Sequence, residues 1–175
     1  MLFRSGLVCG ACGDIFLDLK YVQRDKDYLW TMLGFIAFGI GHILYVAGMF
    51  VEFYRGQGIL YIIVPLILAI LMGPGTMLVG KLIKAHYGKF YVIAMIYAMM
   101  LFATLFTSFF LWMMYAFTEE TLLAIFIGAI LFVMSDLILN MTYFTEGHEK
   151  PVDIISNSVT YYLAQFLIAL AILFI

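Results

Sequence analysis

The chain has 175 residues, of which 66% are apolar and only 11% are charged. Soluble domains have about half apolar and roughly a quarter charged residues, so a water-soluble enzyme of this size and a disordered chain are both excluded. Nine Lys and Arg against eleven Asp and Glu leave no strongly basic face for a nucleic acid. The composition predicts an all-α integral membrane protein.

Six apolar stretches are long enough to cross a bilayer, and short connections join them. We expect helices over residues 2–20, 28–54, 58–84, 89–117, 120–143 and 153–175. The third contains Gly73-Pro74-Gly75, where we expect a kink or a break. Without a linker or low-complexity segment between them, the helices form one transmembrane domain over residues 1–175.

The charges in the connections predict the orientation of the chain. Seven of the nine basic residues lie in or next to the first, third and fifth connections: Lys20, Arg24, Lys26, Lys81, Lys84, Lys89 and Lys150. Arg4 and Arg55 fall on the other side. By the positive-inside rule the seven-charge side is cytoplasmic and both termini face outward. Compactness and the lack of tails favour a bacterial cytoplasmic membrane.

The two cysteines, Cys9 and Cys12, have the C-x-x-C spacing of some zinc and redox sites. No second pair of ligands follows at suitable spacing for tetrahedral zinc. Glycines surround both residues, so we interpret them as small residues on a helix-packing face and expect no metal site.

Ionisable residues inside a bilayer are costly and point to function. Asp14 and Asp136 lie at similar depth, roughly 9 and 12 Å from the cationic ends of their helices at about 1.5 Å per residue. Asn140 follows Asp136 on the same helix face, and His42 and Tyr45 lie one turn apart near the middle of the second helix.

The last helix carries a polar stripe of its own. Asn157, Tyr161 and Gln165 are spaced i, i+4 and i+8, which places them on one face, and Tyr162 adjoins the stripe. Any of these groups taken alone could be an interhelical hydrogen bond that only holds the bundle together. Two aspartates at one depth with several polar partners favour a functional cavity instead.

Two carboxyl groups in one low-dielectric site can divide the roles of acid and base. Glycosidases use such a pair on acetal-like bonds, through an oxocarbenium-like transition state. The same pair could carry protons or sodium in a small secondary transporter, and a broken third helix would favour that alternative. An inactive structural relative is a third possibility. Spacing does not separate these alternatives.

Four motifs in order resemble the YhhN/lysoplasmalogenase family of multi-pass membrane proteins. They are Gly13-Asp14, His42-x-x-Tyr45, Gly128-Ala129-x-Leu131-Phe132-x-x-Ser135-Asp136 and Thr160-Tyr161-Tyr162-x-Ala164-Gln165. Family members usually have about eight spans, and this chain starts just before the Gly-Asp motif, so we expect the N-terminal spans of the family to be missing.

The resemblance implies hydrolysis of the vinyl ether bond of lysoplasmalogens, which gives a fatty aldehyde and a glycerophosphoethanolamine or glycerophosphocholine. It implies a lysophospholipid substrate taken from the membrane lipid and no cofactor. Carried onto this sequence, the family's paired aspartates are Asp14 and Asp136. The supporting or substrate-binding residues would be His42, Tyr45, Asn140, Asn157, Tyr161, Tyr162 and Gln165.

Overall fold

The computed structural model describes residues 1–56, 58–147 and 150–174, and within them it contains only helices and their connections. The α-helices are α1 (Leu2–Val22), α2 (Asp27–Phe53), α3 (Leu60–Leu82), α4 (Tyr91–Met114), α5 (Glu120–Phe144) and α6 (Pro151–Ala171). Short 3-10 turns precede α2 and α4 and follow α6. The all-α fold is confirmed, and the expected helix ends differ by a few residues. Residue 175, the expected end of the last helix, lies outside the described residues.

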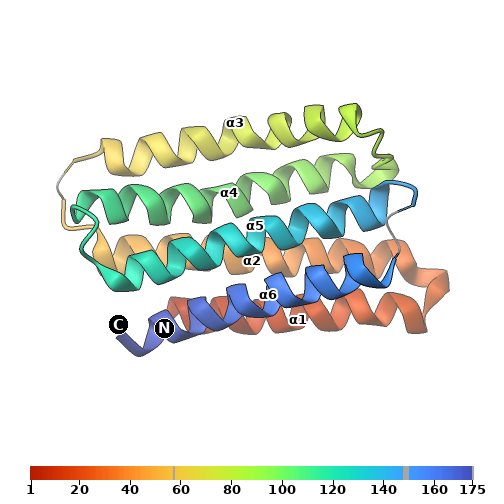
Figure 1. The fold of residues 1–175 in the computed structure, drawn as a ribbon, viewed down its shortest axis with the longest axis horizontal. Coiled ribbons are helices and arrows are strands. Elements are labelled where there is room, and N and C mark those ends of the chain that lie inside the picture. The colour runs from red at the N-terminus through yellow and green to blue at the C-terminus, as the bar shows by residue number, and fades with distance from the viewer. Residues whose placement is uncertain (57, 148–149, 175) are drawn as a thin grey trace.

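In the described part of the chain, five helices are long and apolar enough to cross a membrane: α2 to α6. The helix α1 is as long as α6, at 21 residues, but it carries Arg4, Asp14, Asp18 and Lys20 and is not among the five. It nevertheless packs lengthwise against α2 (Figure 1). A sixth span through α1 therefore stays a prediction, while a multi-pass membrane protein is supported by the other five helices.

The helix α3 has no break at Gly73-Pro74-Gly75 and is continuous from Leu60 to Leu82. Pro74 removes one backbone donor, but it lies on the exposed face of α3, and glycines on both sides leave room for its ring. The Thr76 hydroxyl donates to the Gly73 carbonyl at 2.7 Å, which satisfies a backbone acceptor beside the proline. The helix α3 therefore lacks the break that would favour a transporter.

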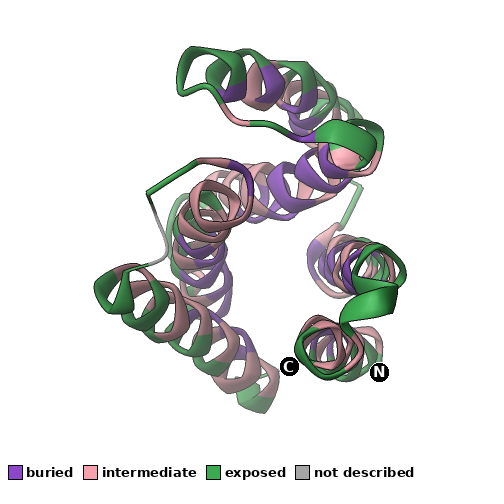
Figure 2. Ribbon diagram, turned by 90° about the vertical axis from the view of Figure 1, so that its right-hand side faces the viewer, coloured by how far each residue is buried: buried purple, intermediate pink, exposed green. Residues whose placement is uncertain are grey.

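The six helices form three antiparallel hairpins, α1–α2, α3–α4 and α5–α6 (Figure 1). The central helix is α4, which packs against α2, α3 and α5. Seen along the helix axes, the α1–α2 and α5–α6 pairs diverge on one side of α4, while α3 lies on its other side (Figure 2). The connections that carry most of the basic residues all lie at one end of the bundle.

Close packing of α1 on α2 depends on glycines, as is common between membrane helices. A Cβ added to Gly6 would lie 3.1 Å from the backbone oxygen of Gly41 and 2.5 Å from the Tyr45 ring. Cys9 is half-buried at this contact, whereas Cys12 is exposed and faces away from it. The packing-face interpretation therefore holds for Cys9 and is wrong for Cys12.

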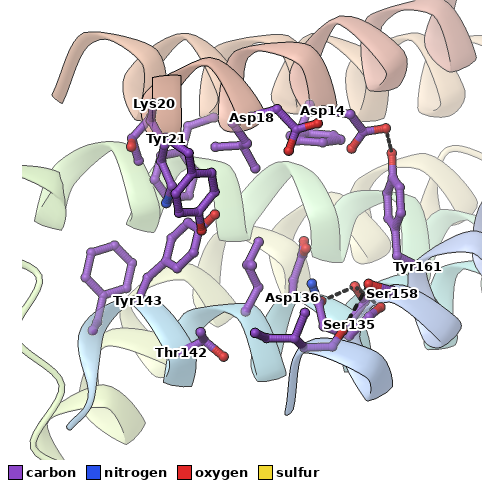
Figure 3. Close-up of a pocket in the computed structure, with 18 of the residues that line it drawn as sticks. Asp14, Asp18, Lys20, Tyr21, Ser135, Asp136, Thr142, Tyr143, Ser158 and Tyr161 are labelled. Carbon is purple, nitrogen blue, oxygen red and sulfur yellow. Dashed lines mark hydrogen bonds between the residues drawn. The ribbon is translucent and has the colours of Figure 1, made fainter. Parts of the chain in front are cut away.

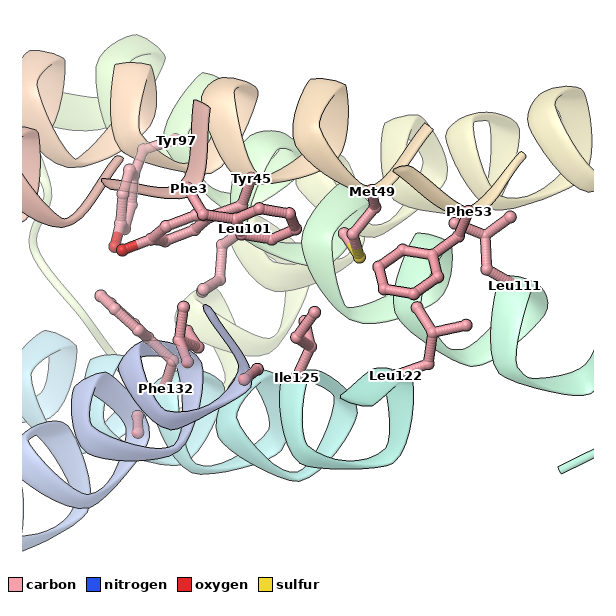
Figure 4. Packing of buried hydrophobic residues seen from close by; sticks show 13 residues of the cluster. Phe3, Tyr45, Met49, Phe53, Tyr97, Leu101, Leu111, Leu122, Ile125 and Phe132 are labelled. Carbon is pink, nitrogen blue, oxygen red and sulfur yellow. The ribbon is translucent and has the colours of Figure 1, made fainter. Parts of the chain in front are cut away.

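The end of the bundle away from most of the basic residues is filled by apolar side chains. Met49, Leu111, Leu122 and Ile125 are fully buried there, and Phe53 lies beside them (Figure 4). The hydroxyl of Tyr115 donates to the Phe53 carbonyl at 2.9 Å and ties α4 to α2. This packing closes the end of the bundle that lies away from the basic residues.

Candidate active site

A cavity of about 1100 Å³ lies between the α1–α2 and α5–α6 hairpins, with α4 as its floor. We call it the polar cavity. Figure 3 shows several of its polar side chains: Asp14, Asp18, Lys20, Ser135, Asp136 and Tyr161. Tyr97 and Asn157 also line it. Small-molecule sites typically measure about 300–1,000 Å³, so the polar cavity has room for a ligand of lipid-headgroup size or larger.

Asp14 is the end of a hydrogen-bonded chain that crosses from α1 to α6 and on to α2. The Tyr161 hydroxyl donates to Asp14 Oδ2 at 2.7 Å, and Gln165 Nε2 donates to the Tyr161 hydroxyl at 3.1 Å. The Tyr45 hydroxyl donates to Gln165 Oε1 at 3.3 Å. Tyr45 and Gln165 do not line the polar cavity, so they act on Asp14 through Tyr161.

Asp136 is held by a tyrosine of the neighbouring helix. The Tyr97 hydroxyl of α4 donates to Asp136 Oδ2. One residue earlier, the Ser135 hydroxyl donates to Asn157 Oδ1 at 2.7 Å and fixes α5 against α6 beside the carboxyl group. Each of the two aspartates therefore has its own phenol donor, and each is half-buried.

The two carboxyl groups occupy opposite walls of the polar cavity, Asp14 on α1 and Asp136 on α5 (Figure 3). Each lies eight residues before the last residue of its helix, Val22 or Phe144. At about 1.5 Å per residue, both are roughly 12 Å from the basic end. The structure therefore brings the predicted pair into one cavity at one depth.

His42 lies behind the wall of the polar cavity and does not line it. It is 1% exposed, its Nδ1 lies 3.1 Å from the Thr104 hydroxyl, and no described group bonds to its Nε2. Its ring packs against Tyr97 and Phe132 at centroid distances of 5.8 and 4.8 Å. His42 therefore does not line the polar cavity but packs against Tyr97, whose hydroxyl donates to Asp136.

The remaining candidates divide between two places. Asn157 and Tyr162 line the polar cavity, and Tyr162 is largely exposed. Asn140 does not line it, because its side chain lies on the α3 side of α5, where it accepts a hydrogen bond from Tyr87 at 2.9 Å.

Charged residues line the α1–α2 side of the polar cavity at its mouth, which lies at the basic end of the bundle. Asp18 and Lys20 come from the end of α1, Arg24 comes from the turn that follows, and Asp27 is the first residue of α2. The Lys20 ammonium lies 3.3 Å from the centre of the Tyr143 ring, a cation–π contact between α1 and α5. Both signs of charge are present, so the mouth fits a zwitterionic group.

Sequence reasoning missed Tyr97. Tyr97 lies in the most aromatic helix of the chain, where nothing local distinguishes it from a packing residue. It lies six residues after the start of α4, roughly 9 Å from the basic end at about 1.5 Å per residue, and only the packing of α4 on α5 reveals its partner.

A search of curated proteins and a search of solved structures each found no match. The sequence model of the YhhN family matches residues 1–172, which is nearly the whole chain. The match includes every helix described above and both carboxyl groups of the polar cavity. The chain therefore belongs to the YhhN family.

Proposed function

We propose that the chain is a membrane lipid hydrolase that cleaves the vinyl ether bond of lysoplasmalogens. Membership of the YhhN family suggests a lysoplasmalogenase-like membrane function. The observation that carries the proposal is the pair Asp14 and Asp136, each with a tyrosine donor, on opposite walls of one cavity at membrane depth. The products are a fatty aldehyde and a glycerophosphoethanolamine or glycerophosphocholine.

The reaction begins with proton transfer from one carboxyl group to the alkene carbon farther from the ether oxygen. The carbon next to that oxygen then carries oxocarbenium character, which the other, ionised carboxylate stabilises. Water adds to this carbon and loses its proton to the same carboxylate, which leaves a hemiacetal. As the hemiacetal collapses, the second carboxyl group returns the proton that it took from water to the glycerol oxygen. The first carboxylate takes the proton of the hemiacetal hydroxyl group, so the aldehyde and the glycerol hydroxyl form and both carboxyl groups return to their starting states.

We assign the proton donor to Asp136 and the ionised group to Asp14. Asp136 borders an apolar cavity as well as the polar one, and an ionised carboxylate is poorly solvated beside apolar walls. Asp14 shares its wall with Asp18 and Lys20 near the polar mouth. Tyr161 orients the Asp14 carboxylate toward the water, and Gln165 orients Tyr161.

The headgroup of the substrate would lie at the mouth of the polar cavity. Lys20 and Arg24 offer charge-assisted donors to its phosphate, and Asp18 and Asp27 face its amine or quaternary ammonium group. The mouth lies at the end of the bundle that carries seven of the nine basic residues. We propose that this end faces the cytoplasm, because basic connections stay on the cytoplasmic side.

Lys20→Met should raise the KM for lysoplasmalogen by about tenfold and leave kcat nearly unchanged. A hydrogen bond to a charged group is worth about 1.5–3 kcal/mol, and the phosphate contact is the same in the ground and transition states. Lys26→Met is the matched control, because Lys26 is exposed and does not line the polar cavity. Steady-state kinetics with both variants checks this, and a fall in kcat alone would contradict a headgroup role.

The proposal is tested by offering the purified protein two lysophospholipids that differ in one bond. The vinyl ether should release aldehyde, while the saturated alkyl ether with the same headgroup should not react, because it has no alkene to protonate. Equal cleavage of both would exclude alkene protonation. If a folded protein releases no aldehyde, the hydrolase fails, and ion-dependent uptake into proteoliposomes then tests the transporter alternative, which the unbroken α3 does not favour.

A further inference from the structure

A second cavity, of about 590 Å³, lies between α3, α4 and α5 on the other side of Asp136. We call it the apolar cavity. Most of its walls are hydrocarbon or thioether groups, among them Met72, Met77, Ala98, Leu101 and Val133. Its volume is within the range of about 300–1,000 Å³ that is usual for small-molecule sites.

The two cavities meet at Asp136. Asp136 and Tyr97 line both of them, as do Tyr143 and Leu139. The carboxyl group that we assign as the proton donor therefore stands between a charged compartment and a hydrocarbon compartment.

The apolar cavity also borders the surface of the bundle that faces membrane hydrocarbon. Val79 on α3 and Leu137 on α5 both line it, and both are about half exposed. A hydrocarbon chain could enter between α3 and α5 without leaving an apolar environment, so its transfer from the bilayer would cost little.

We propose that the apolar cavity binds the hydrocarbon chain of a single-chain amphiphile whose head end lies in the polar cavity. This inference rests on the proposed function for the identity of the head end. This placement agrees with the assignment of Asp136 as the proton donor and Asp14 as the ionised group. The alkene carbon that receives the proton is the one attached to the hydrocarbon chain. With the chain in the apolar cavity, that carbon faces Asp136, and the carbon attacked by water faces the polar cavity and Asp14.

The protein has one position at which a larger side chain would fill part of the apolar cavity without a clash. Gly75 lines the cavity, and a Cβ added there would have no atom within 4 Å. The Gly75→Phe variant should therefore fold, and its phenyl ring should shorten the space that is left for the hydrocarbon chain of the ligand. Met72→Ala, one turn earlier, should lengthen it.

The test measures aldehyde release from vinyl ether lysophospholipids of short, medium and long chain, with the protein in lipid nanodiscs. We expect Gly75→Phe to lower kcat/KM for the long chain at least about tenfold relative to the short one, since one methylene in an apolar pocket is worth about 10- to 200-fold. Met72→Ala should shift the preference toward the long chain. Leu78→Phe, on the exposed face of the same helix, should keep the wild-type profile.

Unchanged chain-length profiles in both Gly75→Phe and Met72→Ala would overturn the inference, even if the wild type is active. Binding of the saturated alkyl ether analogues, which cannot react, gives a second readout with the same variants. If the wild type releases no aldehyde but Gly75→Phe still weakens binding of the long-chain analogue, the proposed function fails and the chain site stands. If the wild type releases no aldehyde and neither variant changes binding of the analogues, both the proposed hydrolase and the proposed site for the hydrocarbon chain are contradicted.

Discussion

Asp136→Asn abolishes most of the aldehyde release, lowering kcat by about one hundred- to ten-thousandfold, the usual contribution of a general acid. The amide cannot give up a proton to the alkene, but it has the shape of the carboxyl group. Its oxygen still accepts the hydrogen bond that Tyr97 donates to Asp136. The variant should therefore keep the helical content and melting temperature of the wild type, so that the loss is chemical.

Asp14→Asn should cause a loss of similar order, and the double variant Asp14→Asn/Asp136→Asn should be little worse than either single one. Residues that act as a unit in one transition state are not additive. Asp25→Asn is the control with the same chemical change, because Asp25 is exposed in the turn before α2 and lies outside the polar cavity. Additive losses, or an equal loss in Asp25→Asn, would contradict paired carboxyl chemistry.

Gly6→Ala should lower the free energy of unfolding by about 1–3 kcal/mol, the usual cost of overpacking. The added Cβ would meet the Tyr45 ring at 2.5 Å and the Gly41 backbone oxygen at 3.1 Å. Tyr45 cannot turn away easily, since it is 2% exposed and packs against Phe3 and His42. Separation of α1 from α2 would also move Asp14, so activity should fall with stability.

The control for this prediction is the same substitution at a glycine with space around it. Gly75→Ala adds a Cβ that meets no atom within 4 Å. Replacing a helix-interior glycine with alanine then stabilises the helix by roughly 0.5–1 kcal/mol. Thermal unfolding in detergent should move in opposite directions for the two variants. A melting temperature of Gly6→Ala at or above the wild type would show that α1 does not pack tightly on α2.

The helices and the aspartate pair were accessible from sequence because both depend on local patterns. A stretch of about twenty apolar residues specifies a membrane helix, and counting along such helices gives the depth of Asp14 and Asp136. The stripe of Asn157, Tyr161 and Gln165 follows in the same way from helical spacing.

Contacts between helices were not accessible in this way. The donor to Asp136 is Tyr97, 39 residues away in sequence, and many tyrosines could have filled that role. The burial of His42 behind Tyr97 and the turn of Asn140 toward α3 depend on the rotation of α2 and α5 about their axes. Lateral packing of side chains sets that rotation, and the apolar composition of every face conceals it from a single sequence.

The most direct test of the central claim is hydrolysis of a lysoplasmalogen in D₂O by the purified wild-type protein, with the aldehyde trapped at once by borohydride reduction. Protonation of the alkene by a solvent-exchanged carboxyl group predicts one deuterium on the carbon next to the former carbonyl carbon. Asp136→Asn should give almost no product under the same conditions. Aldehyde without deuterium at that carbon, or equal release by Asp136→Asn, would contradict the account.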